Sequence, residues 1–249
     1  MRLTLFGQDI GTQIGKVCKK PVLNSVRISS PLKLGQENKE EVPPIAEYLV
    51  GQRGVRFEDG RTETDIDAVV YCTGYFYSYP FLGSLDPPVV TTGRRVRGLH
   101  QQLFNIHHPT LAFTALPQKV IPFPLSEAQG AAIAKVWANK LNLPTKEEME
   151  IAEEMQVNES GDGTKFHVFG YPNDANYLNG LHNWVKTASD GFAKEPVHWD
   201  ERHLWERELY VEMRKKFIET GGHAKRSEEL GFRFEDRDGE KKIDMTDGT

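Results

Sequence analysis

Several signatures of secreted and membrane proteins are missing from this sequence of 249 residues. Its two cysteines, Cys18 and Cys72, are far apart and lack metal-type spacing, which favours a reduced intracellular protein over a disulfide-bonded one. No apolar run approaches the roughly 18 residues that span a bilayer, and the first apolar stretch is too short for a signal peptide. We therefore expect a cytoplasmic protein with no membrane partner.

The sequence also lacks a strong excess of one charge and the commonest catalytic motifs. The formal net charge is -5, with acidic and basic residues interspersed, so binding to nucleic acid is not expected. There is no Gly-x-Ser-x-Gly elbow, no phosphate-binding Gly-x-x-x-x-Gly-Lys loop and no His-Glu-x-x-His motif. The pairs His107-His108 and His198 with His203 lack the i, i+4 spacing of metal ligands on a helix, so no metal site is predicted.

The most informative segment present is residues 65–75, which read DIDAVVYCTGY. An acidic start, a β-branched run and an abrupt Thr73-Gly74 stop predict a buried parallel strand whose end lets a ligand approach the backbone. A nucleotide is the ligand that this pattern favours. Many doubly wound sheets contain a similar strand, so the segment alone does not define a family.

The region before this strand predicts half of a βαβ unit. A helix is expected over Ile10 to Cys18 and a strand over Pro21 to Arg27. A short helix is then expected from Ile45 to Val50, and Asp59-Gly60 predicts a tight hairpin, because both residues tolerate positive φ.

Two features of this half-unit suit a dinucleotide. Gly7 stands where the third glycine of a dinucleotide fingerprint precedes its helix, although Arg2 and Thr4 do not fit the two earlier positions. Arg27 ends the predicted strand, at the position that receives the 2′-phosphate of NADP, with Ser29 close by. The alternatives are an ordinary helix start and a solvated arginine.

A second informative stretch covers residues 109–129. Short strands are expected over Leu103 to Ile106 and Thr110 to Thr114, followed by a helix from Ser126 to about Leu141. Ser126 and Gln129 have capping-box spacing. The alternative is simply a capped helix after a strand.

The remaining chain is helical and charged. An apolar stripe at helical spacing predicts core packing, with Gly221-Gly222 as the helix stop; it comprises Trp205, Leu209, Met213 and Phe217. Residues 235–249 have few apolar side chains and are expected to be disordered.

Taken in order, residues 67–75 and 109–129 resemble the flavin-containing monooxygenases, closest to their soluble fungal members. The resemblance implies an α/β fold, namely a partial flavoprotein of the two-dinucleotide-binding-domain type with incomplete Rossmann-like sheets and a helical carboxyl-terminal extension. It implies residues 1–70 as a partial NADPH domain, 71–145 as the returning part of the FAD domain, 146–222 as the helical extension and 223–249 as a disordered tail. The family's amino-terminal FAD-binding segment has no counterpart here.

The resemblance implies FAD and NADPH as cofactors, and N- or S-oxygenation of a small soft nucleophile with O2. It carries cofactor binding over to Gly7, Arg27, Ser29, Thr73, Gly74, Tyr75, Gln118, Pro124 and Ser126. The amino end of the second-stretch helix would face the flavin ring. Cys72 replaces the family's usual Ala, and Ala115 stands where Gly is common. No catalytic residue is assigned, because the flavin performs the chemistry.

Two alternatives stay open. One is a non-catalytic, truncated remnant that binds a partner or itself through exposed sheet edges. The other is a flavin reductase or Baeyer-Villiger enzyme, which would use the same cofactors for different chemistry.

Overall fold

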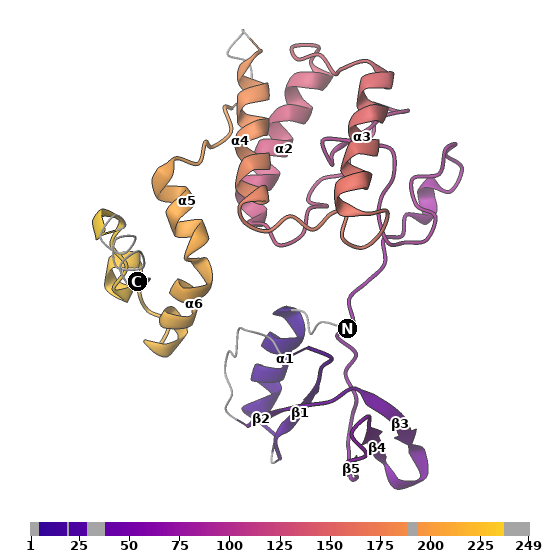
Figure 1. Ribbon diagram of the computed structural model, residues 1–249, viewed down its shortest axis with the longest axis vertical. Helices are drawn as coiled ribbons and strands as arrows, with labels where there is room; N and C mark the ends of the chain where they lie inside the picture. Colours follow the sequence, from indigo (N-terminus) through magenta and orange to yellow (C-terminus); the bar gives the residue numbers. More distant parts are fainter. Residues whose placement is uncertain (1–4, 19, 29–37, 189–193, 237–249) are drawn as a thin grey trace, which may run out of the picture. The chain divides into compact units, whose positions relative to one another are not determined.

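The chain forms two compact units. A computed structural model describes residues 5–18, 20–28, 38–188 and 194–236. The first unit comprises Met1–Tyr75 with Val211–Leu230, and the second comprises Phe76–Tyr210 with Gly231–Thr249 (Figure 1). Both contain helices and small sheets, so the chain is an α/β protein as expected. No helix in the described ranges has the length and apolar character needed to cross a membrane.

The first unit contains half of a βαβ arrangement. Helix α1 (Leu5–Gly15) precedes strand β1 (Val22–Ser25), which pairs in parallel with β2 (Lys39–Val42). A Cβ built on Gly11 would lie 3.2 Å from Asn24 Oδ1, so this glycine permits close packing of α1 against β1. The expected helix and strand are therefore confirmed, although the helix begins earlier and ends sooner than the sequence predicts.

A second sheet in this unit is antiparallel, in the order β3-β4-β5. Its strands are β3 (Ile45–Leu49), β4 (Gly54–Phe57) and β5 (Thr62–Glu63), with a 3-10 turn, η1 (Val50–Gln52), between the first two. The hairpin at Asp59-Gly60 is confirmed, with Gly60 at φ 87°. The helix expected from Ile45 to Val50 is wrong: Ile45 pairs with Phe57, and both pack in a small core with Val42 and Val55. Cross-strand pairing outweighs local helix preference here.

The buried strand expected over residues 65–75 is also wrong. The segment is extended but belongs to no strand. Val70 is 57% exposed, Tyr71 67% and Tyr75 96%. A strand needs a neighbour to satisfy its backbone groups, and no described residue supplies one for 67–75.

The second unit is mainly helical. Strands β6 (Leu99–His100) and β7 (Phe104–Asn105) form a small antiparallel pair. The helices are α2 (Pro122–Trp137), α3 (Lys146–Ser160) and α4 (Asn173–Lys186), and a 3-10 turn, η2 (Pro80–Leu82), precedes them. Helices α2 and α4 lie side by side (Figure 1) and bury a core that includes Leu103, Phe104, Ala128, Ala132, Leu178, Leu181 and Val185. Of the two short strands expected near His107, the first is β7 and the second is a single bridge from Ala112 to Phe104.

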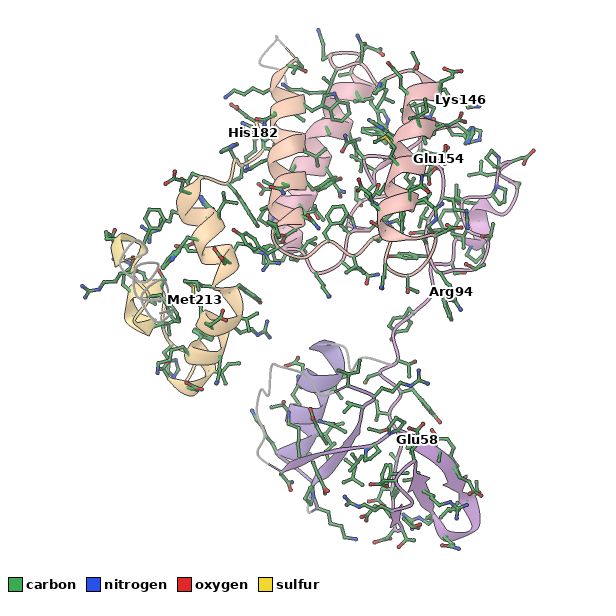
Figure 2. The ribbon with its side chains drawn as sticks, in the orientation of Figure 1. Glu58, Arg94, Lys146, Glu154, His182 and Met213 are labelled. Carbon is green, nitrogen blue, oxygen red and sulfur yellow. The ribbon has the colours of Figure 1, made fainter. Side chains whose placement is uncertain are left out.

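The apolar stripe of the carboxyl-terminal region runs over two helices. These are α5 (Glu201–Glu208) and α6 (Tyr210–Glu219), which are followed by the 3-10 turns η3 (Ser227–Leu230) and η4 (Phe234–Asp236). The four stripe residues are half-buried rather than core residues, and Figure 2 labels Met213 on α6. Gly221 and Gly222, at φ 88° and 76°, end the helical run as predicted. Residues 237–249 of the expected disordered tail lie outside the described residues.

A buried histidine joins distant loops of the second unit. His167 Nε2 accepts a hydrogen bond of 2.9 Å from the Val96 amide, and Nδ1 contacts Gln102 Oε1. Burial, with a smaller effect of the Arg95 charge, lowers the pKa of His167 to about 4. The ring is therefore neutral at pH 7, with its proton on Nδ1, and both ring nitrogens have partners.

Candidate cofactor-binding site

The first unit carries the residues expected to bind a dinucleotide. Gly7 is buried in the first turn of α1, and Arg27 is exposed in a bend just after β1. Ligands of parallel α/β sheets bind at the carboxyl ends of strands, which is where Arg27 stands. No described side chain forms an ion pair with Arg27, so its charge is open to a phosphate. Ser29 lies outside the described residues.

Helix α1 packs on the parallel pair β1 and β2. The tight approach of Gly11 to Asn24 is the helix-to-strand contact that such a fold needs. The sequence analysis missed Gly11, although its place four residues after Gly7 on a short helix could have indicated it. The first unit therefore has a helix packed on a parallel strand pair, with an exposed arginine just after β1.

The Thr73-Gly74 pair also belongs to the first unit. Gly74 adopts φ 84°, a left-handed conformation that favours glycine. A Cβ built there would meet no atom within 4 Å, so the need for glycine comes from the backbone angle and not from close contact. Thr73, Gly74 and Tyr75 are all exposed.

The other three predicted residues lie in the second unit. Gln118 is exposed; its Nε2 donates to Tyr77 Oη at 3.0 Å, and its backbone bridges to Val168. Pro124 is half-buried in the first turn of α2, and Ser126 is exposed in the second. The structure thus brings Gln118, Pro124 and Ser126 into one unit and Gly7, Arg27 and Thr73 to Tyr75 into the other.

The start of α2 differs from the expected capping box. The helix begins at Pro122 rather than Ser126, because a proline in the first turn already has a helical φ and needs no amide hydrogen. Ile121 is the N-cap residue and makes no side-chain cap. The Gln129 side chain does not bond to Ser126; its partners are Ala115 and Tyr177.

Two prolines in the first turn reduce the number of hydrogen-bond donors at the start of α2. Pro122 and Pro124 have no amide hydrogen, and the amide of Leu125 already bonds to Ile121 O at 3.4 Å. Among the first four residues of α2, Phe123 alone keeps an amide hydrogen without a described acceptor. This donor set does not fit the expected stabilisation of an electron-rich flavin ring by the start of α2.

Sequence reasoning missed the residues that fix the loop before α2. Gln129 is fully buried; its Oε1 accepts from the Ala115 amide at 2.8 Å and its Nε2 donates to Tyr177 Oη at 2.9 Å. Tyr177 in turn donates to Gln101 O at 2.6 Å. Ala115 has φ 57°, which explains why glycine suits this position. A lone glutamine on an alanine-rich helix face was the only sequence signal.

Known proteins resemble the chain over most of its length. The model of the flavin-binding monooxygenase-like family matches residues 16–188. The thiol-specific monooxygenase of Saccharomyces cerevisiae is 32% identical over 234 residues, which cover 88% of this chain and 50% of that protein. The senecionine N-oxygenase of Tyria jacobaeae is 37% identical over 98 residues, or 39% of this chain and 21% of that protein.

A solved structure agrees with these matches. The S-allyl-L-cysteine S-oxygenase of Allium sativum superposes with a TM-score of 0.70 at 26% identity, covering 91% of this chain and 51% of that one. The chain spans about half the length of the thiol-specific relative and of this solved structure.

Gln129→Leu tests the hydrogen bonds by which Gln129 holds the Ala115 loop and Tyr177. Removing this buried side chain's amide leaves the Ala115 amide and the Tyr177 hydroxyl each short of a partner, so we expect the free energy of unfolding to fall by about 2 kcal/mol. Gln118→Leu is the matched control, because the same change at an exposed residue removes only an exposed hydrogen bond and should lower the free energy by less than about 1 kcal/mol. Urea unfolding measures both, and equal losses would contradict the assigned role.

Proposed function

The chain belongs to the flavin-binding monooxygenase-like family, and we propose that its function is NADPH- and flavin-dependent oxygenation of a soft sulfur or nitrogen atom in a small molecule. The family match over residues 16–188 is the observation that carries this proposal. A flavin supplies the oxygen-transfer chemistry when it is bound. The chain's own residues are left to bind, orient and shield the reactants.

Sulfur is favoured over nitrogen by the relatives that match most of the chain. The thiol-specific monooxygenase matches 88% of it and the S-allyl-L-cysteine S-oxygenase 91%, whereas the N-oxygenase matches 39%. We therefore propose a thiol or thioether as the first substrate class to test. O2 would be the second substrate.

In this proposal the first unit binds NADPH. The first turn of α1, with buried Gly7, would receive the pyrophosphate, and Arg27 would pair with the 2′-phosphate. The open bend around Arg27 and the close α1–β1 packing at Gly11 support this placement.

A non-catalytic role in binding another polypeptide is the second candidate. One observation favours it: residues 67–75 expose a strand-like sequence. The proposed catalysis and this role predict opposite results in a single assay.

The assay incubates the purified protein with FAD, NADPH and O2 and with a thioether, an amine or a ketone. We expect a yellow protein with near-equimolar flavin, and a sulfoxide as the main product. An ester from the ketone would instead indicate Baeyer-Villiger chemistry. A colourless protein that yields no oxygenated product would contradict the catalytic proposal for this chain.

Arg27→Ala tests the NADPH site separately from catalysis. Loss of a charge-assisted contact to the 2′-phosphate should weaken NADPH binding by about tenfold and leave NADH binding unchanged. Arg56→Ala is the matched control, since Arg56 is an exposed arginine of the same unit that pairs with Glu47 on β3. Isothermal titration calorimetry gives the affinities. If the two variants lose equal affinity for NADPH, or Arg27→Ala loses affinity for both nucleotides, Arg27 does not read the 2′-phosphate.

A further inference from the structure

The guanidinium of Arg207 joins three separate parts of the second unit. Arg207 lies in the last turn of α5, and its Nε donates to Asp174 Oδ2, in the first turn of α4, at 2.7 Å. Its Nη2 donates to the carbonyl oxygen of Lys119, in the loop before α2, at 3.1 Å. One side chain of α5 therefore contacts both α4 and the segment that leads into α2.

The contact with Asp174 is a buried ion pair. The side chain of Asp174 is 3% exposed and that of Arg207 is 13% exposed. Asp174 Oδ1 has no hydrogen-bond partner among the described residues, so the carboxylate depends on Arg207 for its neutralisation. The guanidinium carbon also lies 5.8 Å from the centre of the Tyr210 ring. Because a buried charge without its partner is strongly destabilising, this pair fixes where the guanidinium lies.

The contact with Lys119 adds nothing to the neutralisation of Asp174, so it needs a separate explanation. Lys119 has φ 57°, in the left-handed region that residues other than glycine rarely adopt. The preceding residue, Gln118, donates its amide to His167 O at 2.6 Å and accepts from the Phe169 amide at 3.1 Å. The donor from Arg207 therefore stabilises the carbonyl end of a turn whose other end is held by the chain before α4.

We propose that Arg207 is a positioning residue for the Gln118–Lys119 turn, through which α5 sets the conformation of the segment that carries Gln118. A planar guanidinium suits this role, because it directs two donors at two acceptors with a fixed angle between them. Gln118 is one of the residues expected to bind the cofactor, so the consequence for cofactor binding rests on the proposed function. The carboxyl-terminal extension then supports the cofactor site.

Two variants separate positioning of the turn from stability of the fold. Arg207→Met leaves Asp174 buried and unpaired, so we expect it to lower the urea concentration at which half of the protein is unfolded. Arg207→Met combined with Asp174→Leu replaces the ion pair by apolar side chains, which should bring this midpoint most of the way back. In both variants the side chain at position 207 no longer donates to the Lys119 carbonyl.

Amide hydrogen exchange of the folded double variant then decides the role of Arg207. We expect the amides of Gln118 and Phe169 to exchange about tenfold faster although the midpoint is restored, because the turn opens locally. The amide of Gly161, which bonds to Val157 O at the end of α3, should exchange as before. If the exchange of Gln118 and Phe169 returns to its original rate together with the midpoint, Arg207 only holds the helices together and the proposal is overturned.

Arg202→Met is the matched control. It removes another arginine of α5, one whose ion pair with Glu206 lies within the same helix. The exchange of the Gln118 and Phe169 amides should be unchanged in this variant. Exchange as fast as in the double variant would overturn the proposal, because it would show that any lost arginine of α5 loosens the turn.

Titration with FAD, followed by flavin fluorescence, tests the consequence for the cofactor. The double variant should bind FAD about tenfold more weakly, whereas Arg202→Met should bind it as the unchanged protein does. Equal affinity of the double variant and the unchanged protein would overturn the support of the cofactor site by Arg207. An unchanged protein that binds no FAD would contradict the proposed function instead, and the exchange rates would still decide whether Arg207 positions the turn.

Discussion

An extended stretch of backbone needs a neighbour that accepts and donates its hydrogen bonds, and this requirement governs the structure. Where the neighbour is close in sequence, as for β3 and β4, the strand forms and builds a small core around Val55 and Phe57. Where no described residue supplies a neighbour, as for residues 67–75, the same kind of sequence stays extended and exposed. Strand-forming composition is thus necessary for a strand but not sufficient.

Buried polar side chains play a comparable part in the second unit. Gln129 connects α2 to the Ala115 loop and to Tyr177, while His167 connects the Val96 loop to Gln102. Each uses both of its polar atoms, so neither leaves an unsatisfied group in the core. These two residues determine the path of the irregular chain that precedes and follows α2 and α3.

Local patterns predicted the local structure well. The Asp59-Gly60 hairpin, the strand near Val22 and the stop at Gly221-Gly222 follow from turn and strand chemistry that involves few neighbours. The sequence could not predict that Ile45 pairs with Phe57, since that pairing is a tertiary contact. It also placed the start of α2 four residues late, because it treated Pro122 as a residue of the extended chain when proline equally suits a first helical turn.

The candidate site was only partly predictable, for a related reason. The motif order identified the family, which the match over residues 16–188 confirms. Spacing could not show that Pro122 and Pro124 leave one open amide at the start of α2, or that a buried Gln129 fixes the adjacent loop. Amide hydrogen exchange tests most directly whether residues 67–75 lack the hydrogen-bonded neighbours that β4 has. We predict that at low protein concentration the amides of residues 68–75 exchange about as fast as those of an unfolded chain, while those of β4 are protected. Equal protection of the two segments in a monomer would contradict it.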